Sequence, residues 1–145
     1  MNRMILLLGA CAIAATGAYF TLRPEPLPAQ ATGSSSPTTG GALVTIQMPP
    51  IEGNAAIGQR IFETTCTGCH GSNGTGVDGA GPPLIHRVYE PSHHGDEAFQ
   101  RAVAYGVQSH HWPFGNMPAV EGLTRGDVAM VVAYIREIQR ANGIQ

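Results

Sequence analysis

Apolar residues recur at helical spacing in three separate stretches of this chain, and helix-ending signals flank each stretch. The first stretch predicts a helix from Ala55 to about Thr64, with Asn54 as its N-cap. Its larger apolar side chains, which we expect to lie on one inner side, are Ile57, Ile61 and Phe62. Gly58 stands one turn before Phe62, and glycine inside a helix costs up to about 1 kcal/mol against alanine. We therefore expect another element to pack closely at Gly58.

The other two periodic stretches lie in the C-terminal half of the chain. Asp96 to Tyr105 predicts a short amphipathic helix that ends at Gly106, with Ala98, Phe99, Ala102 and Val103 facing inward. A longer helix is predicted to begin after Thr124, which forms a capping-box spacing with Asp127, and to end near Ala141. Its apolar stripe consists of Val128, Val131, Val132, Ile135 and Ile138. If the first and last helices cross at Gly58, Phe62 will lie near Tyr134.

The N-terminus has a different pattern, because Met4 to Leu22 is uncharged and mostly apolar, between Arg3 and Arg23. About 19 residues rising about 1.5 Å each nearly span a hydrocarbon core of about 30 Å. This run is either a retained membrane anchor or a cleaved signal peptide, with small-residue cleavage sites before Tyr19 and Thr32. In both cases the basic N-terminus stays inside, so the rest of the chain lies on the periplasmic side of a bacterial inner membrane.

Proline, glycine and serine dominate the next segment, residues 24–50, which predicts a flexible linker. Within it, the run from Ala42 to Ile46 could make a strand-like contact with the domain that follows. The sequence thus divides into an anchor or signal (residues 1–23), a linker (24–50) and one small domain (51–145).

Composition narrows the function classes. The formal net charge is −2 and the eight basic residues are all arginine, so no nucleic-acid-binding surface is indicated. Two of the three cysteines stand in one short motif, and the third, Cys11, lies in the apolar N-terminal run. A disulfide framework is therefore not expected.

That motif is Cys66-Thr67-Gly68-Cys69-His70, and C-x-x-C-H is typical of covalent attachment of a c-type haem. Two thiols on a tight turn can each add to one vinyl group of the porphyrin, which places the following imidazole against the iron. A zinc site would require a second pair of ligands, and a thioredoxin-like pair would require a βαβ context. Neither is visible, so the motif predicts one covalently attached haem, with His70 as an iron ligand.

Taken in order, Gly58-x-x-x-Phe62, the C-x-x-C-H motif, Gly81-Pro82 and a Met-Pro before the last helix resemble a class I c-type cytochrome. The resemblance covers roughly residues 53–143. It implies an all-α cytochrome c fold wrapped around one haem, and an N-terminal apolar helix and a linker precede that fold here. It further implies that Cys66 and Cys69 carry the haem.

Residue by residue, the resemblance implies further roles around the haem. The Pro82 carbonyl would accept a hydrogen bond from His70, Leu84 would pack on the haem, and Met117 would be the second axial ligand. Met130 is the rival methionine, but its place on the last helix favours packing in the core. His86 stands where the family often has glycine.

Five histidines besides His70 have no role in this scheme: His86, His93, His94, His110 and His111. They could cap turns, contact haem propionates or lie exposed. They could also form a docking surface beside the haem edge or a second metal site, or supply a bis-His ligand in place of Met117. Trp112, which follows the second His-His pair, could donate its indole N–H to a propionate or simply pack.

The function that these features imply is one-electron transfer, with no open coordination position for a substrate. Expected partners are a redox protein donor and acceptor, such as a membrane complex, an oxidase or a copper protein. Two alternatives remain: a fixed haem subunit of a larger dehydrogenase or oxidase, and a haem enzyme or ligand sensor with a displaceable distal ligand.

Overall fold

The computed structural model describes residues 41–145, so the predicted N-terminal anchor or signal lies outside the described residues, with most of the linker. The described part contains α2 (Gly53–Thr65), α3 (Thr67–His70), α4 (Asp96–Tyr105) and α5 (Arg125–Ala141). Two short 3₁₀ helices, η1 (Ser72–Gly74) and η2 (Arg87–Tyr89), lie in the long connection between α3 and α4. Within residues 41–145 there is no β-strand, only two isolated bridges, so the all-α prediction is confirmed.

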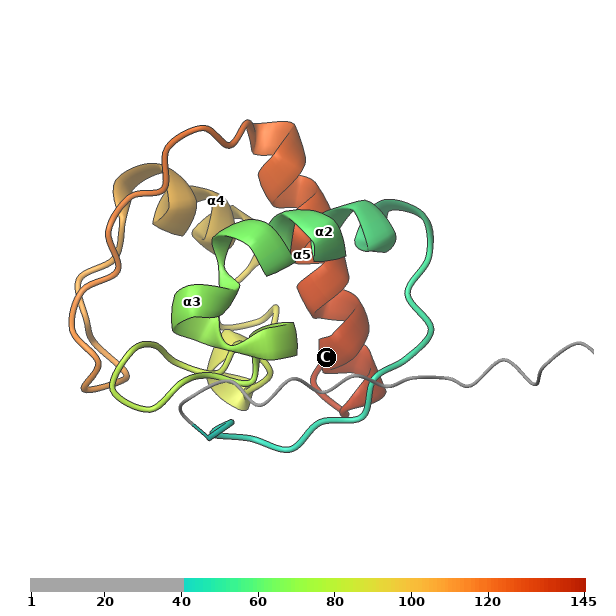
Figure 1. The fold of residues 1–145 in the computed structure, drawn as a ribbon, viewed down its shortest axis with the longest axis horizontal. Coiled ribbons are helices and arrows are strands. Elements are labelled where there is room, and N and C mark those ends of the chain that lie inside the picture. Colours follow the sequence, from blue (N-terminus) through green and yellow to red (C-terminus); the bar gives the residue numbers. More distant parts are fainter. Residues whose placement is uncertain (1–40) are drawn as a thin grey trace, which may run out of the picture. The chain divides into compact units, whose positions relative to one another are not determined.

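The crossing of α2 over α5 forms the centre of the domain (Figure 1). Gly58 allows this crossing, because a Cβ there would lie only 1.8 Å from the Met130 carbonyl oxygen. The rings of Phe62 and Tyr134 pack against each other beside it, with centroids 5.6 Å apart and both side chains fully buried. The prediction made from Gly58 is therefore confirmed.

Helix α5 agrees closely with its sequence pattern. The Thr124 hydroxyl accepts from the Asp127 N–H at 3.2 Å, and the Asp127 carboxylate accepts from the Thr124 N–H at 2.9 Å, which completes the capping box. Every residue of the predicted apolar stripe is buried. The stripe therefore supplies α5's side of the core.

Two details of α2 were predicted wrongly. The helix begins at Gly53 after Glu52, whose carbonyl accepts from the Ala56 N–H, so Asn54 lies within the first turn and is not the N-cap. Ile57 was expected inside but is 43% exposed. The side of α2 that meets α5 carries Ala55, Gly58 and Phe62, and successive helical positions are turned by about 100°, which directs Ile57 away.

The end of the predicted linker lies against the domain. The Leu43 N–H donates to the Thr75 carbonyl at 3.0 Å, and the Gln47 N–H donates to the Asn142 side chain at 2.8 Å. The sequence analysis began the domain at residue 51. In the structure, residues before 51 also make contacts with the domain. The strand-like run around Leu43 makes this contact without forming a strand.

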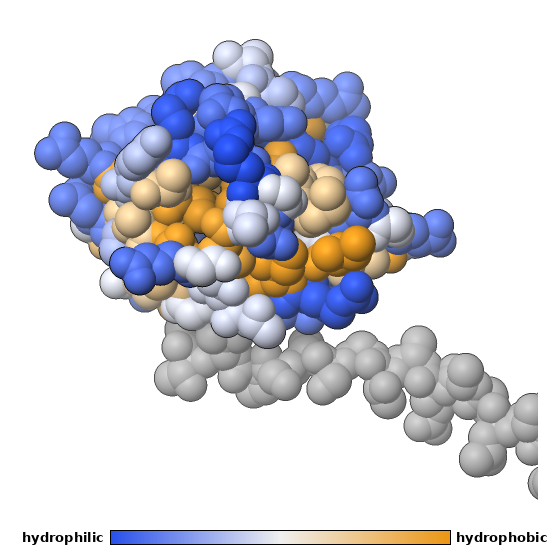
Figure 2. Space-filling view, turned by 90° about the horizontal axis from the view of Figure 1, so that it is seen from above, coloured by the Kyte–Doolittle hydropathy of each residue, from blue (hydrophilic) through white to orange (hydrophobic). Residues whose placement is uncertain are grey.

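Apolar residues are not confined to the interior. One face of the molecule shows them gathered in a band that hydrophilic residues border (Figure 2). No helix in the part of the chain that the structure describes is long and apolar enough to span a bilayer.

Candidate functional site

A largely apolar cavity of about 540 Å³ lies among α3, α4 and the loop that joins α4 to α5. This volume lies within the range of about 300–1,000 Å³ typical of cofactor and small-molecule sites. Cys66, His70 and Met117 line it, together with Leu84 and Trp112. The five residues come from three separate parts of the sequence, and the fold brings them to one space.

The two motif cysteines occupy a single turn. Helix α3 begins after Cys66, whose carbonyl accepts from the N–H groups of Cys69 at 3.2 Å and His70 at 2.9 Å. Cys66 is half-buried and lines the cavity, whereas Cys69 is exposed. Burial, together with the neighbouring Cys69, raises the pKa of the Cys66 thiol to about 11. Cys66 therefore offers a neutral thiol to the cavity.

The His70 imidazole is oriented from behind by a backbone carbonyl. Its Nδ1 lies 3.0 Å from the Pro82 oxygen, and because a carbonyl only accepts, Nδ1 carries the proton. Burial lowers the pKa of His70, and the bond to Pro82 opposes that effect. A neutral ring with a protonated Nδ1 leaves the Nε2 lone pair free for a metal ion, an arrangement common behind ligating histidines.

Gly81 allows the Pro82 carbonyl to approach the motif. A Cβ at Gly81 would lie 2.6 Å from the Cys69 carbonyl oxygen, so only glycine fits between the two backbones. The predicted Gly81-Pro82 element therefore has a steric reason in this fold.

Met117 is held by a backbone pair between two parts of one loop. Its N–H donates to the Val107 carbonyl at 3.0 Å, and its carbonyl accepts from the Val107 N–H at 2.9 Å. Met117 lines the cavity with His70, whereas Met130 is half-buried on α5 and is not among the lining residues. The structure thus places Met117, and not Met130, in the space that His70 faces.

Helix α4 forms one wall of the cavity. The residues predicted to face inward, Ala98, Phe99, Ala102 and Val103, all line it. Gly106 ends the helix, as its sequence indicated. The apolar wall lowers the local dielectric around any group bound there.

Trp112 contributes a buried donor. Its indole Nε1 has no hydrogen-bond partner among the described residues, although a buried N–H normally has one. Burial raises the pKa of the Tyr89 phenol to about 12, and the nearby Trp112 indole opposes that rise. This contact does not reach hydrogen-bond geometry, so the indole N–H is left without an acceptor among the described residues.

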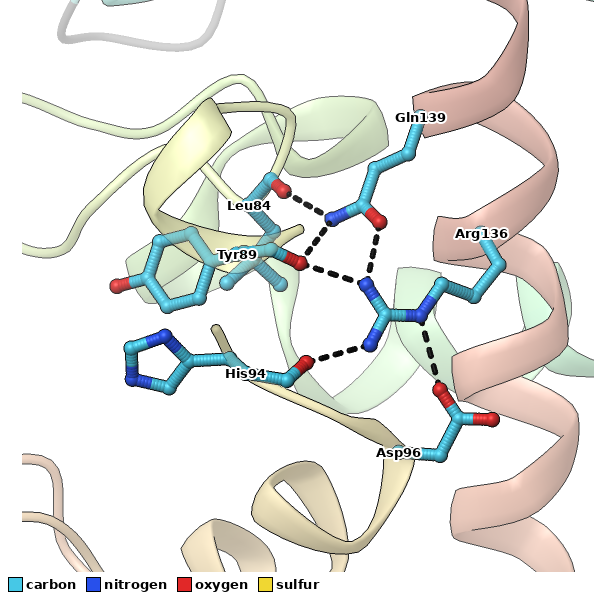
Figure 3. A network of polar contacts seen from close by, with 6 residues as sticks. All are labelled: Leu84, Tyr89, His94, Asp96, Arg136 and Gln139. Atoms are coloured by element: carbon cyan, nitrogen blue, oxygen red, sulfur yellow. Dashed lines mark hydrogen bonds and ion pairs between the residues drawn. The ribbon is translucent and has the colours of Figure 1, made fainter. Parts of the chain in front are cut away.

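The sequence analysis missed a buried polar network behind the cavity, which Figure 3 shows. The Arg136 side chain donates to the backbone carbonyls of Tyr89 and His94 at 2.6 Å each and to Asp96 at 2.9 Å. Gln139 donates to the carbonyl of Leu84 at 2.8 Å. Both side chains stand on the inner side of α5, and a helical projection of their positions could have identified them.

The remaining histidines fall into two groups. His86 caps η2, accepting from the Val88 N–H at 3.2 Å, and its ring packs edge-on to Trp112. His93, His94, His110 and His111 form one cluster of rings around the cavity, and His94, His110 and His111 are among its lining residues.

The residues present fit a haem. The apolar cavity has a cofactor's size, a neutral imidazole with a free lone pair and a thioether face it, and Trp112 offers an unsatisfied donor. Among known proteins, the family model described as Cytochrome c matches residues 55–139. No curated protein matches the chain.

Proposed function

Because this chain belongs to the cytochrome c family and its cofactor is a covalently attached haem c, we propose that it carries single electrons between two redox proteins. The observation that best supports this proposal is that His70 and Met117, from different elements, line one apolar cavity. Two protein ligands on one iron would leave no position for a substrate.

In this proposal, four residues hold the haem. Cys66 and Cys69 supply the thioethers, His70 supplies an imidazole nitrogen and Met117 supplies a sulfur. The bound haem would accept and release one electron by cycling between ferric and ferrous iron. The soft thioether of Met117 favours the ferrous state and thereby raises the reduction potential.

The other residues position and shield the group. Pro82 accepts the Nδ1 proton of His70, which fixes the ring and increases its basicity. Leu84 and the inner side of α4 exclude water from the cavity. Trp112 would donate its indole N–H to a haem carboxylate.

The partners are proposed as a redox donor and an acceptor, such as a membrane complex, an oxidase or a copper protein. With no lysine and a net charge of −2, the chain lacks the lysine-rich surface that would attract acidic partners. Docking through apolar and arginine side chains is therefore favoured over steering by a lysine ring.

Placement at the periplasmic side of a membrane completes the proposal. The apolar run 4–22 would hold the domain there, and the linker would let it reach fixed complexes at raised effective concentration. If the run is retained, the protein should stay with membranes through high-salt and alkaline washing. Recovery of all haem protein in the periplasmic fraction, with Tyr19 or Thr32 at its N-terminus, would instead indicate a cleaved signal.

A redox titration with a ligand-binding assay tests the carrier function. The purified holoprotein should titrate as one one-electron centre, and its reduced form should not bind carbon monoxide. Rapid carbon monoxide binding to the wild type would favour the ligand sensor or haem enzyme. Comigration with further subunits after gentle detergent extraction would favour the fixed subunit of a larger complex.

A further inference from the structure

Four histidines from opposite ends of α4 meet in space. His93 and His94 precede the helix and His110 and His111 follow it, yet His93 Nε2 lies 3.3 Å from His111 Nε2. One ring nitrogen from each of His93, His94 and His111 lies within 4.8 Å of the other two. The fold therefore brings the imidazole of His111 to the adjacent imidazoles of His93 and His94, which lie on the other side of α4 in the sequence.

The spacing of one pair of these nitrogens matches metal coordination. Zinc–nitrogen bonds of about 2.0–2.1 Å in a tetrahedron place two ligand nitrogens about 3.3–3.4 Å apart. His93 and His111 already have this separation. A hydrogen bond between the two rings would give a similar distance, so the presence of the third imidazole, that of His94, favours the metal site.

His94 is held in the form that a metal ligand needs. Its Nδ1 lies 2.6 Å from the Val88 carbonyl, which only accepts, so the proton is on Nδ1 and Nε2 keeps its lone pair. The buried Arg136 donates to the His94 carbonyl and fixes its backbone, while the imidazole points away from α5 (Figure 3). His94 thus has an orienting acceptor on one side and a rigid backbone attachment on the other.

We propose that His93, His94 and His111 bind one divalent transition-metal ion, zinc or copper, at a site distinct from the haem ligands. Imidazole nitrogen suits both metals, and three protein ligands leave a fourth position for water. His110, whose ring centroid is 4.3 Å from that of His111, lies beside the site. The ion would join the segment before α4 to the loop that carries Met117.

The test measures metal binding to the full-length holoprotein. Zinc binding is measured by equilibrium dialysis against zinc chloride, and copper binding is measured separately by electron paramagnetic resonance with copper sulfate. We expect one ion per chain and, for copper, hyperfine coupling to three nitrogens. His93→Gln and His111→Gln should each weaken binding by at least about tenfold, the scale on which metal sites respond to the loss of supporting groups. The double variant should abolish it.

His86→Asn is the matched control, because asparagine keeps an acceptor for the Val88 N–H while removing an imidazole outside the triad. It should bind zinc as the wild type does. Binding that survives the double variant, or that His86→Asn weakens as strongly, would overturn the proposal, as would a wild type that binds no ion. The measured quantity is metal bound per chain and not electron transfer, so the outcome is independent of whether the electron-carrier function is correct.

Discussion

Gly58 and Met130 meet backbone to backbone where α2 crosses α5. A Cβ at Gly58 would lie 1.8 Å from the Met130 carbonyl oxygen and 2.3 Å from the carbonyl carbon. Neither atom belongs to a flexible side chain, so the clash cannot be relieved by a rotamer change. The two helices themselves would have to separate.

Gly58→Ala should therefore destabilise the holoprotein despite the better helix propensity of alanine. We expect a loss of at least about 1–3 kcal/mol in the free energy of unfolding, the usual cost of overpacking a core. Urea unfolding followed by circular dichroism measures it. Gly126→Ala in α5 is the control, since its nearest contact would be an ordinary 3.5 Å, and it should be neutral or stabilising.

The two methionines should behave differently. A bond from Met117 to the iron gives ferric protein a weak far-red absorption band, so Met117→Ala should abolish that band, lower the reduction potential and open the iron to carbon monoxide. Met130 is half-buried, so Met130→Ala should keep the band and cost less than the about 2–5 kcal/mol of a fully buried methionine. Loss of the band in Met130→Ala but not in Met117→Ala would show that Met130 on α5 is the iron ligand.

Trp112→Phe tests the buried indole N–H. If that donor serves a haem carboxylate, its removal leaves negative charge less compensated near the iron, and the reduction potential should fall. Phe114 stacks on Trp112 with ring centroids 6.0 Å apart and has no donor, so Phe114→Leu is the control. Potentiometric titration of both variants separates the effect of losing the N–H donor from the effect of losing aromatic packing. An unchanged potential in Trp112→Phe would show that the indole only packs.

Arg136→Met should cost several kcal/mol. It removes the donor to the His94 carbonyl and to the Gln139 side-chain oxygen, and each buried group left unpaired costs about 1–3 kcal/mol. The exposed Arg140, paired with Glu137, gives the comparison, because Arg140→Met should change the free energy of unfolding by about 1 kcal/mol or less. Equal effects of the two substitutions in urea unfolding would argue against a stabilising role for the network.

The α5 capping box should make stability depend on pH in the acid range. Hydrogen bonds from the Thr124 hydroxyl and then its backbone N–H hold the pKa of the Asp127 carboxyl below its ordinary value. A depressed carboxyl pKa stabilises the fold above the unfolded value, and this contribution is lost as the pH falls through the folded value. Urea midpoints measured from pH 6 to pH 3 should fall less steeply in Asp127→Asn. A slope unchanged from wild type would exclude this contribution.

Much of the architecture could be predicted from the chain alone. The bounds of α4 and α5, the capping box at Thr124 and the close approach at Gly58 all follow from local patterns that act over a few residues. The C-x-x-C-H motif likewise has its chemistry in five consecutive residues, and that is why the covalent haem could be predicted before any fold was known.

Contacts between distant segments could not be predicted in this way. The exposure of Ile57 depends on which side of α2 meets α5, and the docking of Leu43 on Thr75 depends on the course of a loop. A helical projection places Arg136 on the inner side of α5, but the burial of its charge depends on carbonyl partners that only the fold supplies, since burying a charged group is favourable only where hydrogen bonds replace its water. The His93–His111 approach joins positions 18 apart across a helix, and only the packing of α4 brings their nitrogens to 3.3 Å.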